Sequence, residues 1–163
     1  EGYRITKKKA HCYLFLDPGR FEEIKLWFQL AGWYVWRTPM VWYKGPVIGL
    51  LPLPKQGPRR SYEFILYAIK GDRETIIVAP DVIDVPHDRD IERGAHKPAG
   101  LYTSLLTRTC NPGDKVLDPC CGTGPIFPAA SQTRTIAVGL ETEDNAFSQS
   151  LDRLQSSDIL KSF

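Results

Sequence analysis

The stretch 114–124 reads DKVLDPCCGTG and holds the residue types best suited to binding a charged ligand. A short, mostly apolar run at 115–117 leads directly into Asp118, and a Gly-Thr-Gly turn follows. In an α/β protein this order puts an acidic side chain and a tight turn at the carboxyl end of a strand, where such folds bind ligands. Gly122 and Gly124 allow the turn and let a ligand approach the backbone without a Cβ in its way. The pattern predicts a nucleotide-type site.

A second acidic residue follows the next predicted strand. The run 135–140 ends at Glu141, roughly twenty residues after the turn. A carboxylate there can accept hydrogen bonds from both hydroxyls of a ribose. A dinucleotide fingerprint requires Gly or Ala three residues after Gly124, where this sequence has Phe127. We therefore expect an adenosine-type site and not an NAD or FAD site; the plainer alternative is a strand–helix turn that binds nothing.

The elements that must position these residues alternate along the chain. Helices are predicted at about 18–31, where Asp17 caps the start and Gly32 the end, and at 98–109, 125–131 and 145–155. Strands are predicted at 11–16, 33–43, 62–70, 115–117 and 135–140, with short strands at 75–79 and 82–85. Alternating strands and helices predict an α/β fold with a mostly parallel sheet flanked by helices. The segment 44–61 is rich in proline and glycine and is predicted to be a loop.

Composition excludes several classes of protein. The chain has 163 residues, about one domain by the usual range of roughly 100–200. Lys+Arg 21 against Asp+Glu 19 gives a net charge of +2, too balanced to indicate nucleic-acid binding from bulk charge. No apolar run approaches the roughly 20 residues of a membrane span, and no secretory leader is recognisable. The four cysteines, including adjacent Cys120 and Cys121, fit neither a disulfide framework nor a metal site. We expect reduced thiols, no metal and no membrane.

The beginning of the sequence suggests that the chain is part of a longer protein. It starts at Glu1, and its single methionine is Met40. We therefore expect a segment upstream of Glu1 in the native protein.

Taken together, the motifs resemble the S-adenosylmethionine half of the bacterial and phage DNA amino-methyltransferases, which methylate adenine N6 or cytosine N4. The order of the motifs is that of the permuted subgroup, in which the cofactor motif follows the catalytic motif. Two upstream segments match less specifically: VWYK at 41–44, and YEFILY at 62–67 with Tyr where the family has His. The main resemblance rests on His96-Lys97-Pro98, Leu101, Leu105-Leu106, 113–124, Ala129-Ala130, Arg134, 139–141 and Arg153-Leu154.

The resemblance implies a Rossmann-like methyltransferase fold, incomplete at the N-terminus, in a single domain 1–163 whose cofactor half is 95–163. It implies S-adenosylmethionine as cofactor, double-stranded DNA as partner and a place in restriction–modification in the bacterial or phage-infected cytoplasm. The implied cofactor-binding residues are Lys97, Pro98, Asp118, Pro119, Cys120, Gly122, Thr123, Gly124 and Glu141. The segment 44–61 would be a target-facing loop, with DNA contacts from Lys44, Lys55, Arg59 and Arg60.

The sequence departs from the family at two points. Cys120 stands where the family usually has Phe, so an aromatic wall beside the cofactor is missing. The catalytic tetrapeptide Asp/Asn/Ser-Pro-Pro-Tyr/Phe does not occur in the chain, and we expect it upstream of Glu1, with a strand that would lie between those at 115–117 and 11–16. The 163 residues alone are therefore expected to be inactive. Two alternatives remain: a non-catalytic, methylase-like module that binds nucleic acid, and a methyltransferase for RNA or a small molecule.

Overall fold

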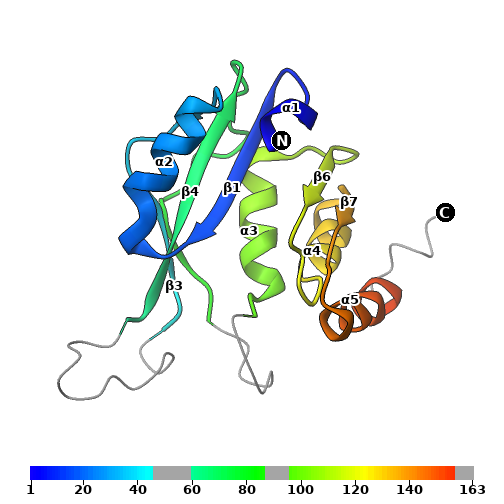
Figure 1. Ribbon diagram of the computed structural model, residues 1–163. Coiled ribbons are helices and arrows are strands. Elements are labelled where there is room, and N and C mark those ends of the chain that lie inside the picture. Colours follow the sequence, from blue (N-terminus) through cyan, green and yellow to red (C-terminus); the bar gives the residue numbers. More distant parts are fainter. Residues whose placement is uncertain (46–59, 87–95, 157–163) are drawn as a thin grey trace, which may run out of the picture. The chain divides into compact units, whose positions relative to one another are not determined.

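The computed structural model describes residues 1–45, 60–86 and 96–156 (Figure 1). The chain divides into two compact units. The first consists of Glu1–Thr75 and Ala79–Pro86, and the second of Ile76–Val78 and His87–Phe163. No helix within the described ranges is long and apolar enough to cross a membrane.

The first unit is built on a sheet with the strand order β1-β4-β3-β5, and β2 also pairs with β4. β4 runs antiparallel to β1, β2 and β3, whereas β3 and β5 are parallel. Its elements are α1 (Gly2–Ile5), β1 (Ala10–Leu16), the 3₁₀ helix η1 (Pro18–Arg20), α2 (Phe21–Leu30), β2 (Tyr34–Val35), β3 (Met40–Tyr43), β4 (Tyr62–Lys70) and β5 (Val82–Asp84).

The α/β fold class is confirmed, but in the described residues the first sheet is mixed rather than mostly parallel. β3 and β4 follow one another in the chain, and successive strands joined by a loop pair antiparallel, whereas parallel strands need a crossover. Because β1 and β3 both run antiparallel to β4, they run in the same direction, and α2 is the crossover helix between them. β4 therefore lies between β1 and β3, the two strands that α2 connects, and runs antiparallel to both.

One face of this sheet is covered by α2 (Figure 1). Phe21 from α2 joins Leu16 of β1, Leu66 of β4 and other buried side chains in one cluster, with Ile24 and Phe28 packed against it. Trp27 of α2, in contrast, is 52% exposed. The Arg20 guanidinium lies over the Trp27 ring, with its central carbon 5.8 Å from the ring centroid.

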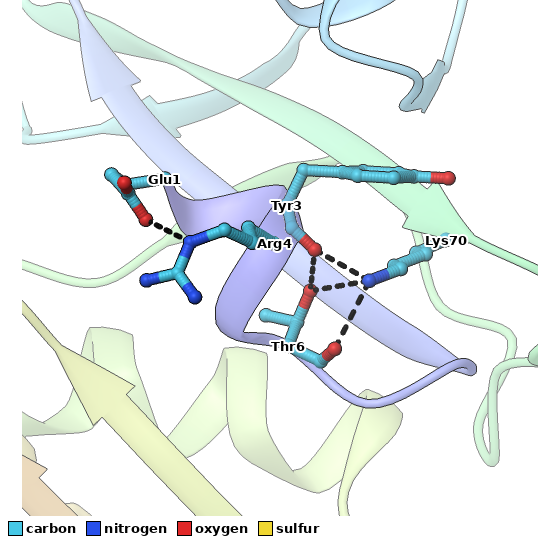
Figure 2. A network of polar contacts seen from close by, with 5 residues as sticks. All are labelled: Glu1, Tyr3, Arg4, Thr6 and Lys70. Atoms are coloured by element: carbon cyan, nitrogen blue, oxygen red, sulfur yellow. Dashed lines mark hydrogen bonds and ion pairs between the residues drawn. The ribbon is translucent and has the colours of Figure 1, made fainter.

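The short helix α1 is fixed to the end of β4 by Lys70 (Figure 2). The ammonium group donates hydrogen bonds to the carbonyl oxygens of Tyr3 at 2.5 Å and Thr6 at 3.0 Å, and lies 4.2 Å from the centroid of the Tyr3 ring. That ring also contacts Trp33 edge-on, with ring centroids 5.4 Å apart. At Gly32, where φ is +102°, a Cβ would lie 2.9 Å from the same ring, so glycine is required both to end α2 and to admit Tyr3.

The second unit contains α3 (Ala99–Thr109), β6 (Lys115–Asp118), α4 (Ile126–Thr133), β7 (Ile136–Gly139) and α5 (Asp144–Ser156). β6 and β7 form a parallel pair that brings Asp118 opposite Gly139. One face of the pair contributes Val116 and Ala137 to a core with Leu106 of α3 and Phe127 of α4. The other face is open: Leu117, Ile136 and Val138 are 42%, 44% and 53% exposed. On α3, Leu101, Leu105 and Leu106 are buried.

Two predicted strands differ from the structure. The run 33–43 forms two strands, β2 and β3, with Pro39 in the break between them. The run 75–79 is not a strand, because the N–H groups of Ile76 and Ile77 donate to the carbonyl oxygen of Arg108 at the end of α3 and so join no ladder. Of the predicted loop 44–61, residues 46–59 lie outside the described ranges.

Candidate functional site

The two predicted acidic residues lie at the carboxyl ends of adjacent parallel strands of the second unit: Asp118 is the last residue of β6, and Glu141 comes two residues after β7. Beyond the β6–β7 ladder, the N–H of Leu140 donates to the carbonyl oxygen of Asp118, and the N–H of Cys121 donates to that of Leu140, both at 2.9 Å. These bonds continue the pairing past the strand ends and into the glycine turn. They hold Asp118, the turn and Glu141 at one edge of the strand pair, as the sequence predicts for a ligand site.

The two glycines of the turn have different roles. Gly122 has φ +54°, and no atom lies within 4 Å of the position that a Cβ would occupy. Gly124 has φ +75°, but a Cβ there would lie 2.8 Å from the Phe127 ring and 2.9 Å from Cβ of Ser150. Gly122 therefore leaves open space where a ligand can approach the backbone, whereas Gly124 allows the start of α4 to pack.

Phe127 occupies the position where a dinucleotide fingerprint has Gly or Ala, and two neighbouring glycines make room for its ring. A Cβ on Gly139 of β7 would lie 2.9 Å from Cζ of the ring, much as one on Gly124 would clash with its edge. The close helix–strand approach is therefore provided by glycines on both sides of a buried Phe127, which is 7% exposed.

The carboxylate of Glu141 is already engaged with backbone N–H groups. One oxygen accepts from Gly122 at 2.8 Å, and the other accepts from Thr142 at 2.7 Å and Glu143 at 2.9 Å. The bonds from Glu143 and Thr142, and then that from Gly122, lower the pKa of Glu141. Since a carboxylate offers about four lone-pair sites, three are used here and about one remains for a ligand hydroxyl. A ribose that presents both hydroxyls to Glu141 would have to share or replace one backbone bond.

Asp118 lies among groups that act on its charge in opposite directions. Burial raises the pKa of its carboxyl group. The N–H of Cys120, at 3.2 Å, and the hydroxyl of Tyr102 donate hydrogen bonds to the carboxylate, and both bonds lower its pKa, as does the positive charge of Lys97. The negative charge of Glu141 acts in the opposite sense. A half-buried carboxylate with these donors is suited to a cationic group of a ligand.

Residues 96–98, which precede α3, and Tyr102 in its first turns contribute to this site. Pro98 is the buried N-cap residue of α3, and the positive charge of Lys97 acts on Asp118. Two residues of the site had no predicted role: His96, whose Nδ1 shares a hydrogen bond of 3.3 Å with the hydroxyl of buried Thr123, and Tyr102. Tyr102 stands at an apolar helical position, so only the fold reveals that its hydroxyl meets Asp118.

The two adjacent cysteines of the turn differ in exposure. Cys120, where the family has an aromatic residue, is exposed, and Cys121 is buried against Gly139. Burial, followed by the negative charges of Asp118 and Glu141, raises the pKa of Cys121. Cys121 is therefore a packing residue, and Cys120 is the thiol that a bound ligand or reagent can reach. Within the described ranges, no group of His, Cys, Asp and Glu residues is arranged to hold a metal ion.

The predicted DNA-contacting residues belong to the first unit. Nζ of Lys44 lies 2.5 Å from a carboxylate oxygen of Glu63 and 5.2 Å from the centroid of the Trp42 ring. Arg60 pairs with Asp17, and this pair is about half exposed on both sides. Exposed pairs contribute little stability, so Arg60 can exchange its partner for another anion more readily than the half-buried Lys44. Lys55 and Arg59 lie outside the described residues.

Comparison with curated proteins identifies a relative that is similar in sequence to most of the chain. The chain is 28% identical over 145 residues to the Type II methyltransferase M.Cfr9I of Citrobacter freundii. The match includes 80% of this chain and 47% of that protein, so the chain spans about half the length of its curated relative. No protein-family model matches the chain.

Solved structures resemble the chain over most of its length. The M1.HpyAVI–SAM complex aligns with a TM-score of 0.77 at 20% identity, over 93% of this chain and 77% of that one. The cytosine-N4-specific PvuII DNA methyltransferase aligns with a TM-score of 0.67 at 14% identity, over 86% of this chain and 58% of that one. The predicted Rossmann-like methyltransferase fold is thereby confirmed.

Proposed function

We propose that this chain is the cofactor-binding and post-catalytic part of a longer, cytoplasmic, S-adenosylmethionine-dependent DNA methyltransferase that modifies the exocyclic amino group of adenine or cytosine. The observation that carries the proposal is the open side of Gly122 between the carboxylates of Asp118 and Glu141. The 28% identity to a Type II methyltransferase points in the same direction.

The residues of the site fit the proposed cofactor. S-adenosylmethionine carries an ammonium group, a ribose and a positively charged sulfonium that supplies the methyl group. The carboxylate of Asp118 would bind the ammonium group of the cofactor through a charge-assisted hydrogen bond. Glu141 would accept a hydrogen bond from a ribose hydroxyl, and the backbone at Gly122 would lie against the ligand. These groups would fix the orientation of the methyl donor, which accounts for much of the acceleration of a transfer between two bound partners.

The catalytic motif would come from the preceding part of the protein. The 163 residues contain no Pro-Pro pair, so they lack the tetrapeptide with which the family holds the target amine. The tetrapeptide upstream of Glu1, and the strand that leads into it, remain part of the proposal. Its partner would be double-stranded DNA, contacted from the segment 44–61.

Cofactor binding can be tested with the 163-residue chain itself. We expect isothermal titration calorimetry to detect S-adenosylmethionine binding that is weakened by Asp118→Asn and by Glu141→Gln. The matched control is Glu22→Gln, which removes an exposed carboxylate of α2 in the first unit. Absence of binding by the unmodified chain, or equal affinity in all four proteins, would contradict the assignment of the site.

Methyl transfer must be tested on both the chain and a longer form that includes the upstream residues. With tritiated S-adenosylmethionine and duplex DNA, we expect transfer by the longer form only, and N6-methyladenine or N4-methylcytosine among the digested nucleosides. Transfer to RNA or a small molecule instead of DNA would favour a different substrate class. A longer form that lacks both the tetrapeptide and any transfer would favour a non-catalytic binding module.

DNA binding by Arg60 is tested in the longer form with Arg60→Ala. Removal of one bond to a phosphate makes the slope of log affinity against log salt concentration shallower by about 0.9. The control is Arg4→Ala, which removes an exposed arginine paired with Glu1. An unchanged affinity and salt slope for the Arg60 variant would remove this residue from the proposed DNA surface.

A further inference from the structure

The two carboxylate oxygens of Glu141 are used unequally. Oε1 accepts hydrogen bonds from the N–H groups of Thr142, at 2.7 Å, and Glu143, at 2.9 Å. Among the described residues, Oε2 accepts one bond, from the N–H of Gly122 at 2.8 Å. Each oxygen of a carboxylate offers about two lone-pair sites. Oε1 is therefore filled by the protein's own backbone, and one acceptor site is left on Oε2.

The remaining acceptor site belongs to the oxygen that faces the open side of the turn. Gly122 donates its N–H to Oε2, and no atom of a more distant residue lies within 4 Å of the position that a Cβ on this glycine would occupy. A ligand group that lies against the backbone of Gly122 therefore displaces no protein atom there. Because Oε2 is bound to the same peptide N–H, such a group has this oxygen within its reach.

A second hydroxyl of a ribose gains little from Oε1. To bond there it must displace the N–H of Thr142 or of Glu143, and both bonds are exposed, so the freed N–H turns to water. One hydrogen bond to the carboxylate is then exchanged for another, and the net gain in affinity is small. The two N–H groups also lie one and two residues from Glu141 along the chain, so their bonds re-form at little entropic cost.

We infer that Glu141 recognises a single ribose hydroxyl of the cofactor, through Oε2, and that the site tolerates changes at the other hydroxyl; this rests on the proposed function for its ligand. The sequence alone predicted a carboxylate that accepts from both hydroxyls, because it does not reveal that the following backbone fills Oε1. The ligands of the site therefore include adenosine cofactors that lack the second hydroxyl.

Glu141→Gln changes this arrangement in a defined way. The N–H groups of Thr142 and Glu143 need the amide oxygen as their acceptor, so the NH₂ group takes the place of Oε2. An amide NH₂ group donates hydrogen bonds and does not accept them. The hydroxyl that Oε2 binds then loses its charged acceptor, and the selectivity between the two hydroxyls should disappear.

The test measures, by isothermal titration calorimetry, the affinity of the 163-residue chain for S-adenosylmethionine and for its 2′-deoxy and 3′-deoxy analogues. We expect one analogue to bind about 10-fold or more weakly than the parent, as for loss of a bond to a charged group, and the other to bind within about 3-fold of it. In Glu141→Gln we expect the two analogues to bind within about 3-fold of each other. Any effect of a missing hydroxyl on the shape of the ribose is common to all proteins and cancels in this comparison.

The matched control is Glu143→Gln. It removes the same charge two residues later, from a side chain that accepts hydrogen bonds from the N–H groups of Asn145 and Ala146 at the start of α5. The N–H of Glu143 still donates to Glu141 in this variant, because only the side chain is changed. We therefore expect Glu143→Gln to keep the preference between the two deoxy analogues.

Two results would overturn the inference. Equal affinity of the unmodified chain for the two deoxy analogues would mean that Glu141 binds both hydroxyls or neither. A preference that persists in Glu141→Gln would mean that another residue selects the hydroxyl. In both cases binding of S-adenosylmethionine itself leaves the proposed function standing, whereas a chain that binds none of the three ligands contradicts the proposed function and the inference together.

Discussion

Alanine at Gly124 will destabilise the second unit more than alanine at Gly122, although both glycines have positive φ. An L-residue in the left-handed region costs roughly 1–2 kcal/mol, and this cost applies to both positions, at φ +75° and +54°. Only at Gly124 does the new methyl group also overlap its neighbours, at 2.8 Å and 2.9 Å from the Phe127 ring. Overpacking of this kind costs about 1–3 kcal/mol, so the two variants should differ by that amount.

Urea unfolding of the two variants measures this difference. The effect of alanine on the unfolded chain is common to both and cancels in the comparison. In thermal unfolding the difference corresponds to about 2–12 °C, at roughly 2–4 °C per kcal/mol for a chain of this size. A second substitution, Phe127→Leu, shortens the side chain and should restore part of the stability lost in Gly124→Ala.

Two results would refute this reasoning. Equal loss of stability in Gly122→Ala and Gly124→Ala would mean that the backbone conformation, and not the contact with Phe127, decides the cost. Strict additivity of Gly124→Ala and Phe127→Leu would lead to the same conclusion, because residues in contact normally show a coupling energy of about 0.5 kcal/mol or more.

Three further predictions concern other parts of the chain. Glu141→Gln weakens the acceptor for the Gly122 N–H, so hydrogen exchange of the turn amides will accelerate while amides of α3 stay unchanged; equal protection in both proteins would contradict this role. Lys70→Met keeps the apolar stem but removes the bonds to the carbonyl oxygens of α1, which should lower the free energy of unfolding by about 1–2 kcal/mol, whereas Lys9→Met, at an exposed ion pair, should have little effect. Burial raises the pKa of Cys12 from 9.0 to about 11, so stability present below about pH 9 is lost as the pH rises towards 11. The loss of about 2–3 kcal/mol in urea titrations should be smaller in Cys12→Ala, and identical pH profiles would show that the thiol is not responsible.

Much of the site was predictable because its signals are local. The apolar run before Asp118, the two glycines and the acid after the next strand occur within 28 residues, from 114 to 141. Each signal depends on backbone geometry that neighbouring residues set, so β6, α4 and β7 appear within one or two residues of their predicted bounds. The two roles of the glycines were not predictable, because the difference depends on where Phe127 and Ser150 pack.

The features that sequence analysis missed depend on contacts between distant segments. The hydrogen bond of His96 to Thr123 spans 27 positions, and Tyr102 looks like any half-buried aromatic residue on a helix. The antiparallel insertion of β4 was missed because hydrophobic patterns identify strands but do not give their direction. The run 75–79 has a strong preference for strand, but its N–H groups bond to the end of α3.

The open face of the β6–β7 pair has a practical consequence for work with the isolated chain. Leu117, Ile136 and Val138 present branched apolar side chains to water along two short strands, and within the described ranges these strands pair only with each other. Such a strip favours contact with a second copy or with any exposed strand, so we expect self-association to limit the concentration of usable protein. Titrations should therefore be checked at several protein concentrations by light scattering. Threonine at Ile136 and Val138 would preserve the preference for strand and improve solubility.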